Sequence, residues 1–201
     1  MRQRDKDKVR NKVLFLDSAK ELFTEKGYYN TTMEEIADRA GFSKATIYNY
    51  FDGKEHLLTE LISTVFAEIQ SLIDEMFAKE NDFRKGVEAY VEISIDYIEN
   101  NRKFYLVMMS ESFRQKSLVD EVIHKKVFAG IEVLRKRVTD FCNKHENEIN
   151  PNIPPKEIAH MLMALVTGYV GDWMFSRGRG DLRNKKKIVI EQFFNGALAK
   201  T

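Results

Sequence analysis

The chain has little cysteine and no long apolar run. Cys142 is the only cysteine among 201 residues, so an internal disulfide bond is excluded. This cysteine content is typical of proteins in a reducing compartment. No uninterrupted apolar run approaches the roughly 20 residues that a membrane span requires. The basic N-terminus is not followed by the apolar core of a signal peptide. We therefore expect a soluble, cytosolic protein.

The sequence also lacks the short motifs of common enzyme classes. None of its four histidines pairs locally with serine or cysteine in a nucleophile motif, and it has no glycine-rich phosphate loop or HExxH. Asp120 and His124 share a helix face and could seat a metal ion, but solvated side chains or an exposed ion pair explain them more simply. Cys142, close to Lys144 and His145, could be a redox sensor, although an unreactive thiol is the simpler interpretation. We expect no catalysis and no cofactor.

The whole chain has almost no excess of positive or negative charge, but one segment has an excess of positive charge. Thirty-two basic residues nearly balance 31 acidic ones, so the net charge of +1 neither predicts nor excludes an anionic partner. Residues 1–12, MRQRDKDKVRNK, hold six basic and two acidic residues, a local charge of +4. Taken alone, this segment is typical of a frayed, solvated terminus.

Proline is scarce, and apolar residues recur at helical spacing. All three prolines fall in NPNIPP, at 150–155, and the chain is 43% hydrophobic and 31% charged. One apolar pattern, over 54–80, crosses about six turns without a breaker. We predict an all-α fold of about nine helices. Three precede residue 54, and five follow residue 80, near 83–99, 102–114, 118–146, 156–176 and 183–199.

The segment 31–51 predicts two short helices joined by a tight turn. Thr32 and Glu35 form a capping box at the start of the first helix. Gly41 ends that helix, and Ser43 can cap a second one that runs to Tyr50. Small or apolar residues close the interface between the two helices: Ile36, Ala37, Ala40 and Ile47. This is the helix-turn-helix arrangement, whose second helix can enter a DNA major groove.

The second helix, within GFSKATIYNYF at 41–51, carries an unusual mixture of aromatic and polar residues. Lysine and threonine can bond base edges or phosphates, and tyrosine hydroxyls can donate to phosphate oxygens. Each tyrosine taken alone could instead be a packing residue. The residues expected to point outward are Lys44, Ala45, Thr46, Tyr48, Asn49 and, in part, Tyr50. Lys54, at the start of the next helix, could add a phosphate contact.

An ordered series of residues from Asn11 to Leu61 resembles the DNA-binding domain of the tetracycline-repressor (TetR) family. The matching residues are Ala19, Leu22-Phe23, Gly27-Tyr28, Thr31-Thr32, Glu35-Ile36-Ala37, Ala40-Gly41-Phe42-Ser43, Thr46-Ile47-Tyr48, Phe51, Lys54-Glu55 and Leu57-Leu58. The turn Asp52-Gly53 departs slightly from the family pattern. The resemblance implies a three-helix DNA-binding domain at 1–53 and a helical ligand-binding and dimerisation domain at 54–201.

The resemblance also implies which residues touch DNA. Carried over by position, the contacts fall on Thr32, Ser43, Lys44, Ala45, Thr46, Tyr48, Asn49, Tyr50 and Lys54. The helix N-termini at Thr32 and Ser43 would direct free backbone N–H groups at phosphates. Met33 and Ala45 could contact a thymine methyl group. The basic arm gains a second interpretation, in which Arg2, Arg4 or Lys6 reaches the DNA backbone or minor groove.

The C-terminal helices predict a dimer interface. One recognition helix reads too few base pairs for tight specificity, so we expect a symmetric dimer on a palindrome. The 156–176 helix is apolar nearly all round, and Gly168 and Gly171 would allow another helix to approach. The alternative is that Met163 and Ala164 only complete the core of one chain. The predicted interface residues are Met163, Thr167, Val170, Met174, Ile190, Phe193, Phe194 and Ala197.

The middle helices hold large, adaptable side chains that could line an apolar ligand pocket. Taken one by one, such residues are more often ordinary core, but as a group they suit a pocket with a few polar groups. The candidates are Tyr90, Ser94, Tyr97, Phe104, Tyr105, Met108, Met109, Phe113, Phe128 and Thr167. The expectation is a repressor that leaves a palindromic operator when a small, mostly apolar effector binds. A DNA-binding regulator or adaptor controlled by a protein partner, without a small ligand, is the alternative.

Overall fold

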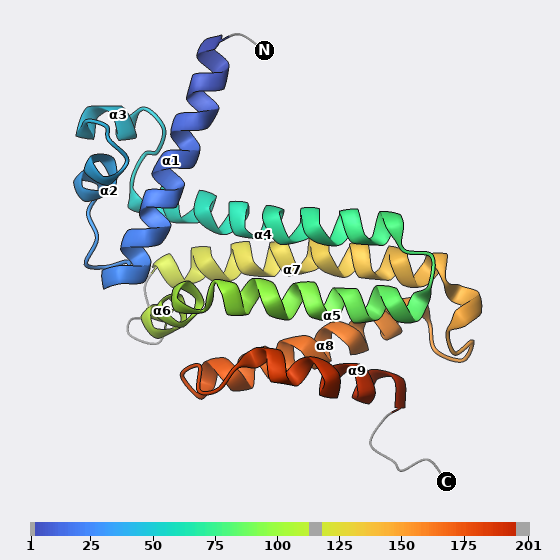
Figure 1. Cartoon of the computed structure of the whole chain (residues 1–201). Helices are drawn as coiled ribbons and strands as arrows, with labels where there is room; N and C mark the ends of the chain where they lie inside the picture. Colours follow the sequence, from blue (N-terminus) through green and yellow to red (C-terminus); the bar gives the residue numbers. More distant parts are fainter. Residues whose placement is uncertain (1–2, 113–117, 196–201) are drawn as a thin grey trace. The chain divides into compact units, whose positions relative to one another are not determined.

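The computed structural model describes residues 3–112 and 118–195, and within them every regular element is helical. The all-α prediction is confirmed (Figure 1). The α-helices of these residues are α1 (Gln3–Lys26), α2 (Met33–Arg39), α3 (Lys44–Tyr48), α4 (Lys54–Lys79), α5 (Phe83–Asn100), α6 (Arg102–Ser112), α7 (Leu118–Lys144), α8 (Pro155–Phe175) and α9 (Lys186–Asn195). Short 3-10 helices, Glu146–Glu148 and Leu182–Lys185, precede α8 and α9.

Some sequence predictions fall outside the part of the chain that is described. These concern Arg2, Phe113, Ala197 and the side chains of Met109 and Asp120. The predicted frayed terminus is wrong for residues 3–12, which form the first turns of α1.

The chain divides into two compact units. The first comprises Met1–Val65 with Lys103–Val127, and the second comprises Phe66–Arg102 with Phe128–Thr201. The helices α4 and α7 each contribute to both units, so the compact units do not divide at the predicted boundary between residues 53 and 54.

In the first unit, the aromatic residues of the 41–51 segment hold it against α1. Phe15 of α1 is completely buried, and its ring centroid lies 4.9 Å from that of Phe42 and 5.3 Å from that of Tyr50. Phe51 meets Phe15 edge-on, with centroids 6.2 Å apart. Aromatic pairs at these separations are favourable beyond the area they bury. Three of the aromatic residues therefore position the short helix α3 and leave its other side chains free to face outward.

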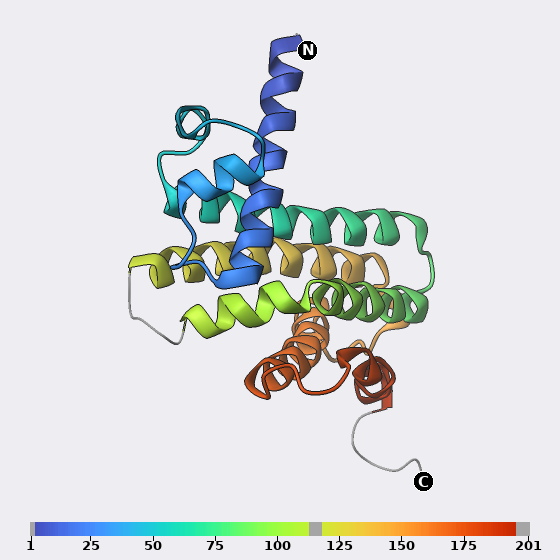
Figure 2. The same ribbon diagram turned by 60° about the vertical axis from the view of Figure 1, so that its left-hand side comes forward.

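In the second unit, α8 and α9 lie side by side and pack on α5 (Figure 2). Val91 and Ile95 of α5, Leu162 of α8 and Val189 of α9 are buried in this core. At Gly86 of α5, an added Cβ would stand 2.1 Å from Cζ of the α7 residue Phe141. Only glycine lets the two helices approach this closely.

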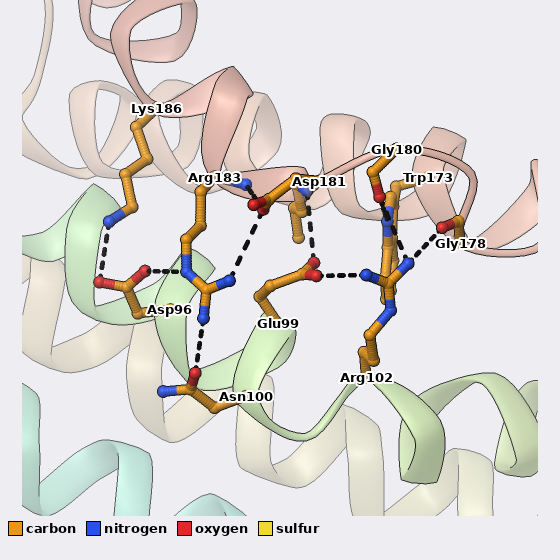
Figure 3. Close-up of polar contacts among 11 residues, drawn as sticks. Asp96, Glu99, Asn100, Arg102, Trp173, Gly178, Gly180, Asp181, Arg183 and Lys186 are labelled. Carbon is orange, nitrogen blue, oxygen red and sulfur yellow. Dashed lines mark hydrogen bonds and ion pairs between the residues drawn. The ribbon is translucent and has the colours of Figure 1, made fainter.

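A polar cluster ties the end of α5 to the segment between α8 and α9 (Figure 3). Glu99 is 5% exposed, and its carboxylate accepts from Arg102 at 2.6 Å and from the backbone N–H of Leu182 at 3.3 Å. Arg102 also donates to the carbonyl of Gly178 and lies 5.4 Å from the ring centroid of Trp173. A buried carboxylate is tolerated when it is paired and hydrogen-bonded in this way.

Helix α8 has an apolar surface that its own chain does not cover fully. Among the described residues it is the one helix long and apolar enough, by length and composition, to cross a membrane, although the sequence led us to expect no such helix. Core helices of water-soluble proteins pass the same test. Only 33% of its most apolar window is buried, so part of its apolar surface is exposed.

Candidate nucleic-acid interface

The turn between α2 and α3 has the local structure that its sequence predicts. Thr32 caps α2 in a complete capping box with Glu35. At the other end, the N–H groups of Gly41 and Phe42 donate to the carbonyls of Asp38 and Ala37, which is the Schellman pattern. Gly41 has a φ of +79°, a conformation that favours glycine. The two helices are therefore joined by a turn of fixed geometry.

Helix α3 has one buried side and one exposed side. Ile47 of α3 is completely buried, as are Ile36 and Ala37 of α2, and the two helices pack on each other. Ser43, whose hydroxyl accepts from the N–H of Thr46 at 3.3 Å, caps the helix. The exposed residues of the segment include the predicted contacts Ser43, Lys44, Ala45, Tyr48 and Asn49, with Thr46 half-buried. A row of exposed polar groups on a short rigid helix is the arrangement that reading a groove requires. Their DNA contacts stay predictions.

Tyr50 is turned toward the protein more than the sequence suggests. Its hydroxyl accepts a hydrogen bond from the Asn11 amide at 3.3 Å, and its ring packs on Phe15. The residue is half-buried. Tyr50 therefore connects α1 to the end of the 41–51 segment, and Tyr48, which is 46% exposed, is the tyrosine of this segment whose ring is more open to solvent.

Two further predicted contacts are placed differently from the expectation. Met33 is 6% exposed and belongs to the core, so its predicted contact with a thymine methyl group is wrong for this conformation. The ammonium of Lys54 lies 2.7 Å from the carbonyls of Tyr28 and Thr31 and 4.4 Å from the Tyr28 ring centroid. These contacts close the turn before α2, so Lys54 has a structural role within the protein rather than an ammonium directed at phosphate.

The exposed residue Lys44 is paired with an acidic side chain that sequence reasoning missed. Its ammonium binds the carboxylate of Glu34, in the first turn of α2. This hydrogen bond raises the pKa of Lys44, so its positive charge is secure near neutral pH. The sequence contains a signal for this pair. Glu34 lies within the capping box of α2, and the predicted helix-turn-helix brings the first turn of α2 close to α3.

Ion pairs also fix α2 to α1. Arg39 donates to Glu25 through both terminal nitrogens, at 2.9 and 2.8 Å, and to Glu21 at 3.2 Å. The hydrogen bond from Arg39 lowers the pKa of Glu25. Lys26 binds Glu35, and this bond together with those from Thr32 lowers the pKa of Glu35 to about 2. The capping carboxylate is therefore ionised at neutral pH.

A second candidate surface lies on α8. Met161, Ala164, Gly168, Gly171 and Phe175 follow one another at steps of three and four, so they share one side of the helix. Met161 and Phe175 are 45% and 71% exposed, and a Cβ added at either glycine would meet nothing within 4 Å. This side is apolar, exposed and narrow at its centre, as the surface of a helix that receives another helix would be.

The predicted interface residues only partly coincide with this surface. Met163 is 7% exposed and packs inside its own chain, so for this residue the core alternative is correct. Thr167 is exposed, and its hydroxyl donates to the Met163 carbonyl at 2.8 Å. Five other predicted residues are half-buried: Val170, Met174, Ile190, Phe193 and Phe194. Met161 and Phe175, the exposed large apolar residues of this surface, are not among the predicted interface residues.

The ligand candidates are distributed over several helices. Tyr90 and Ser94, both 4% exposed, form a hydrogen-bonded pair inside the second unit, and burial raises the pKa of Tyr90 to about 12. The Tyr97 hydroxyl donates to Glu68 at 2.6 Å. Phe128 is 62% exposed, so its placement in a pocket wall is wrong for this conformation. The α6 candidates belong to the first unit, where Phe104 is buried and Tyr105 and Met108 are half-buried.

The remaining reactive groups show ordinary surroundings. Cys142 is completely buried, and burial raises the pKa of its thiol to about 11, which makes the reactive thiolate scarce at neutral pH. His124 is exposed. Within the described residues, no three His, Cys, Asp or Glu side chains gather as metal ligands would.

Comparison with known proteins agrees with the helix-turn-helix geometry. Residues 15–61 match the family model described as "Bacterial regulatory proteins, tetR family". YhgD of Bacillus subtilis (strain 168), an uncharacterized HTH-type transcriptional regulator, is 25% identical over 82% of this chain and 85% of its own length. IcaR of Staphylococcus aureus (strain Newman), the negative transcriptional regulator of the biofilm operon icaADBC, is 22% identical over 94% of this chain and 95% of its own.

The similarity in fold extends along most of the chain. The crystal structure of the transcriptional regulator FadR from Bacillus subtilis, in complex with stearoyl-CoA, superposes with a TM-score of 0.75. The two chains are 20% identical, and the match covers 92% of this chain and 99% of the other. The C-terminal helices therefore share a known fold, although their sequences have diverged.

Proposed function

We propose that this chain, a transcriptional regulator of the tetR family of bacterial regulatory proteins, represses genes by binding a palindromic operator as a homodimer in the cytoplasm. A small, mostly apolar effector releases it from the DNA. The chain is a regulator and not an enzyme.

The observation that carries the proposal is the two-sided character of α3. Its buried side, at Ile47, is fixed against α2, and its exposed side presents Lys44, Tyr48 and Asn49. Lysine can bond guanine O6 and N7, asparagine can bond adenine, and tyrosine can bond phosphate. A rigid helix that displays these three groups fits the major groove.

The exposed side of α8 supports a homodimer. In a monomer, the exposed side chains of Met161 and Phe175 would not contribute to folding stability. The two glycines beside them would lower the stability of the helix. In a symmetric dimer, the same surface of a second copy would cover these residues, and two recognition helices would meet two half-sites. Half-sites one helical turn apart lie about 34 Å from each other.

The interior of the second unit supports an effector with an apolar part. The Tyr90 and Ser94 pair gives a buried region a few polar groups among apolar side chains, as ligand sites typically have. The similar FadR structure holds stearoyl-CoA, which makes a long-chain acyl-CoA the first effector to test. We propose repression rather than activation because the similar protein IcaR is a negative transcriptional regulator.

A mobility-shift assay with the DNA upstream of the chain's own coding sequence tests the proposal. We expect a retarded complex that scrambled DNA of equal length does not compete away, and stearoyl-CoA should dissociate it. Free CoA and a short-chain acyl-CoA serve as matched controls. Specific binding that no apolar compound alters would favour the alternative of control by a protein partner, and the absence of any specific complex would contradict the proposal.

A further inference from the structure

The first turns of α1 extend beyond α2 and α3 (Figures 1 and 2). Residues 3–14 of this helix are exposed or half-buried, and the first completely buried side chain is Phe15. The match to the family model also begins at residue 15. An ordered helical extension therefore precedes the DNA-binding unit that the family shares.

The helical register of this extension selects two of its basic residues. Arg4, Lys8, Asn11 and Phe15 follow at steps of four, three and four, so they form one stripe along the helix. The lower two members both contact Tyr50, through its hydroxyl and its ring. Arg4 and Lys8 therefore lie on the side of α1 that packs on the 41–51 segment, about two turns and one turn, respectively, before Asn11.

The charges of these two residues are not compensated by the described part of the chain. Arg10 pairs with Asp7 at 3.7 Å, and Lys12 pairs with Glu60 at 2.8 Å. Neither Arg4 nor Lys8 has an ion pair or a hydrogen bond among the described residues, and both are exposed. Because the backbone that carries these two cations is already helical, binding an anion would have to order only their side chains.

We propose that Arg4 and Lys8 bind phosphate groups of the duplex beside the base pairs that α3 reads, and so lengthen the footprint of each protomer. The inference rests on the proposed function, because it requires α3 to face DNA. It assigns the contact to the Arg4–Lys8 stripe. Lys6, which the sequence also suggested, is two residues from Lys8 and points to the opposite side of the helix.

The test compares two double variants with equal charge loss. Arg4→Gln/Lys8→Gln removes the stripe, whereas Lys6→Gln/Arg10→Gln removes two charges from the other side. The probe is a duplex that the wild-type chain selects from a random-sequence pool, and binding is followed by fluorescence anisotropy over a range of KCl concentrations. Circular dichroism verifies that both variants keep the helix.

We expect Arg4→Gln/Lys8→Gln to reduce the slope of log affinity against log salt by about 1.8 for each bound protomer, since each lost phosphate contact accounts for about 0.9. The control should change this slope by less than half as much. Equal slopes for the two variants would overturn the inference and leave the proposed function intact. If the wild-type chain enriches no duplex, the proposed function fails first and the inference falls with it.

Discussion

Glu34 and Lys44 form an ion pair that joins the first turn of α2 to the first residue of α3. Lys44, which we propose as a DNA contact, therefore has an acidic partner within its own protein. In the proposed complex, a phosphate or a guanine would compete with this carboxylate for the ammonium group. The ion pair restrains the Lys44 side chain. It weakens the binding of any DNA whose groups interact with the ammonium less strongly than the Glu34 carboxylate does.

Glu34→Gln should therefore strengthen DNA binding. We expect the affinity for scrambled duplex to rise about twofold to fivefold, the scale of one exposed charge pair, with a smaller gain for the selected site. Anisotropy titrations with both duplexes measure the two effects. Asp38→Asn is the matched control, because it removes one exposed negative charge from the same helix. Equal gains for both variants would mean that charge alone matters and the pair does not.

Tyr48 and Lys44 should differ in what they contribute to binding. Tyr48→Phe removes one exposed hydroxyl, and we expect it to weaken binding to selected and scrambled DNA alike by about twofold to tenfold. Lys44→Ala should also change the preferred sequence. Tyr50→Phe removes a hydroxyl that Asn11 already binds, and so should have a smaller effect. Unchanged affinity of Tyr48→Phe at two salt concentrations would remove Tyr48 from the interface.

Arg102 should be important for the stability of the second unit. Arg102→Ala leaves the Glu99 carboxylate, whose side chain is 3% exposed, without its cationic partner. Breaking a buried pair costs about 3–5 kcal/mol, and because Arg102 is itself 38% exposed we expect about 2–3 kcal/mol. Urea unfolding measures the loss. Arg183→Ala breaks the more exposed pair with Asp96 and should cost under about 1 kcal/mol. A similar loss for both variants would contradict the role given to Glu99.

The glycines of α8 test the dimer. In an isolated chain, Gly168→Ala and Gly171→Ala meet no neighbouring atom, so each should stabilise the helix by about 0.8–1 kcal/mol. If a second α8 packs there, the double variant should instead raise the dimer dissociation constant at least tenfold. Analytical ultracentrifugation over a range of concentrations measures this constant. Gly53→Ala, which also has open space around its Cβ, is the control. A double variant that dimerises as tightly as the wild type would place the interface elsewhere.

The sequence predicts best the features that depend on neighbouring residues. The capping box of Thr32 and Glu35, the glycine turn at Gly41 and the cap at Ser43 follow from rules that span three or four residues, and all three are confirmed. The family resemblance rests on this same stretch, which explains why it could be identified without a structure.

The sequence predicts less well the features that depend on distant packing. Contacts with Phe15 and Asn11 fix the orientation of the Tyr50 side chain, and the carbonyls of Tyr28 and Thr31 fix that of Lys54. All of these partners are more than 20 residues away in the sequence. Met163 was assigned outward because α8 is apolar nearly all round, and such a helix does not reveal which side its own chain covers. Glu34 was overlooked because its partner is on another helix.

Interference by dimethyl sulfate on the selected duplex tests most directly whether α3 reads the major groove. The reagent methylates guanine at N7, in the major groove, and adenine at N3, in the minor groove. We predict that guanine methylation abolishes binding in two symmetric half-sites whose centres lie one helical turn, or a multiple of it, apart. Interference confined to adenine N3, or confined to a single site without a symmetric counterpart, would contradict the account.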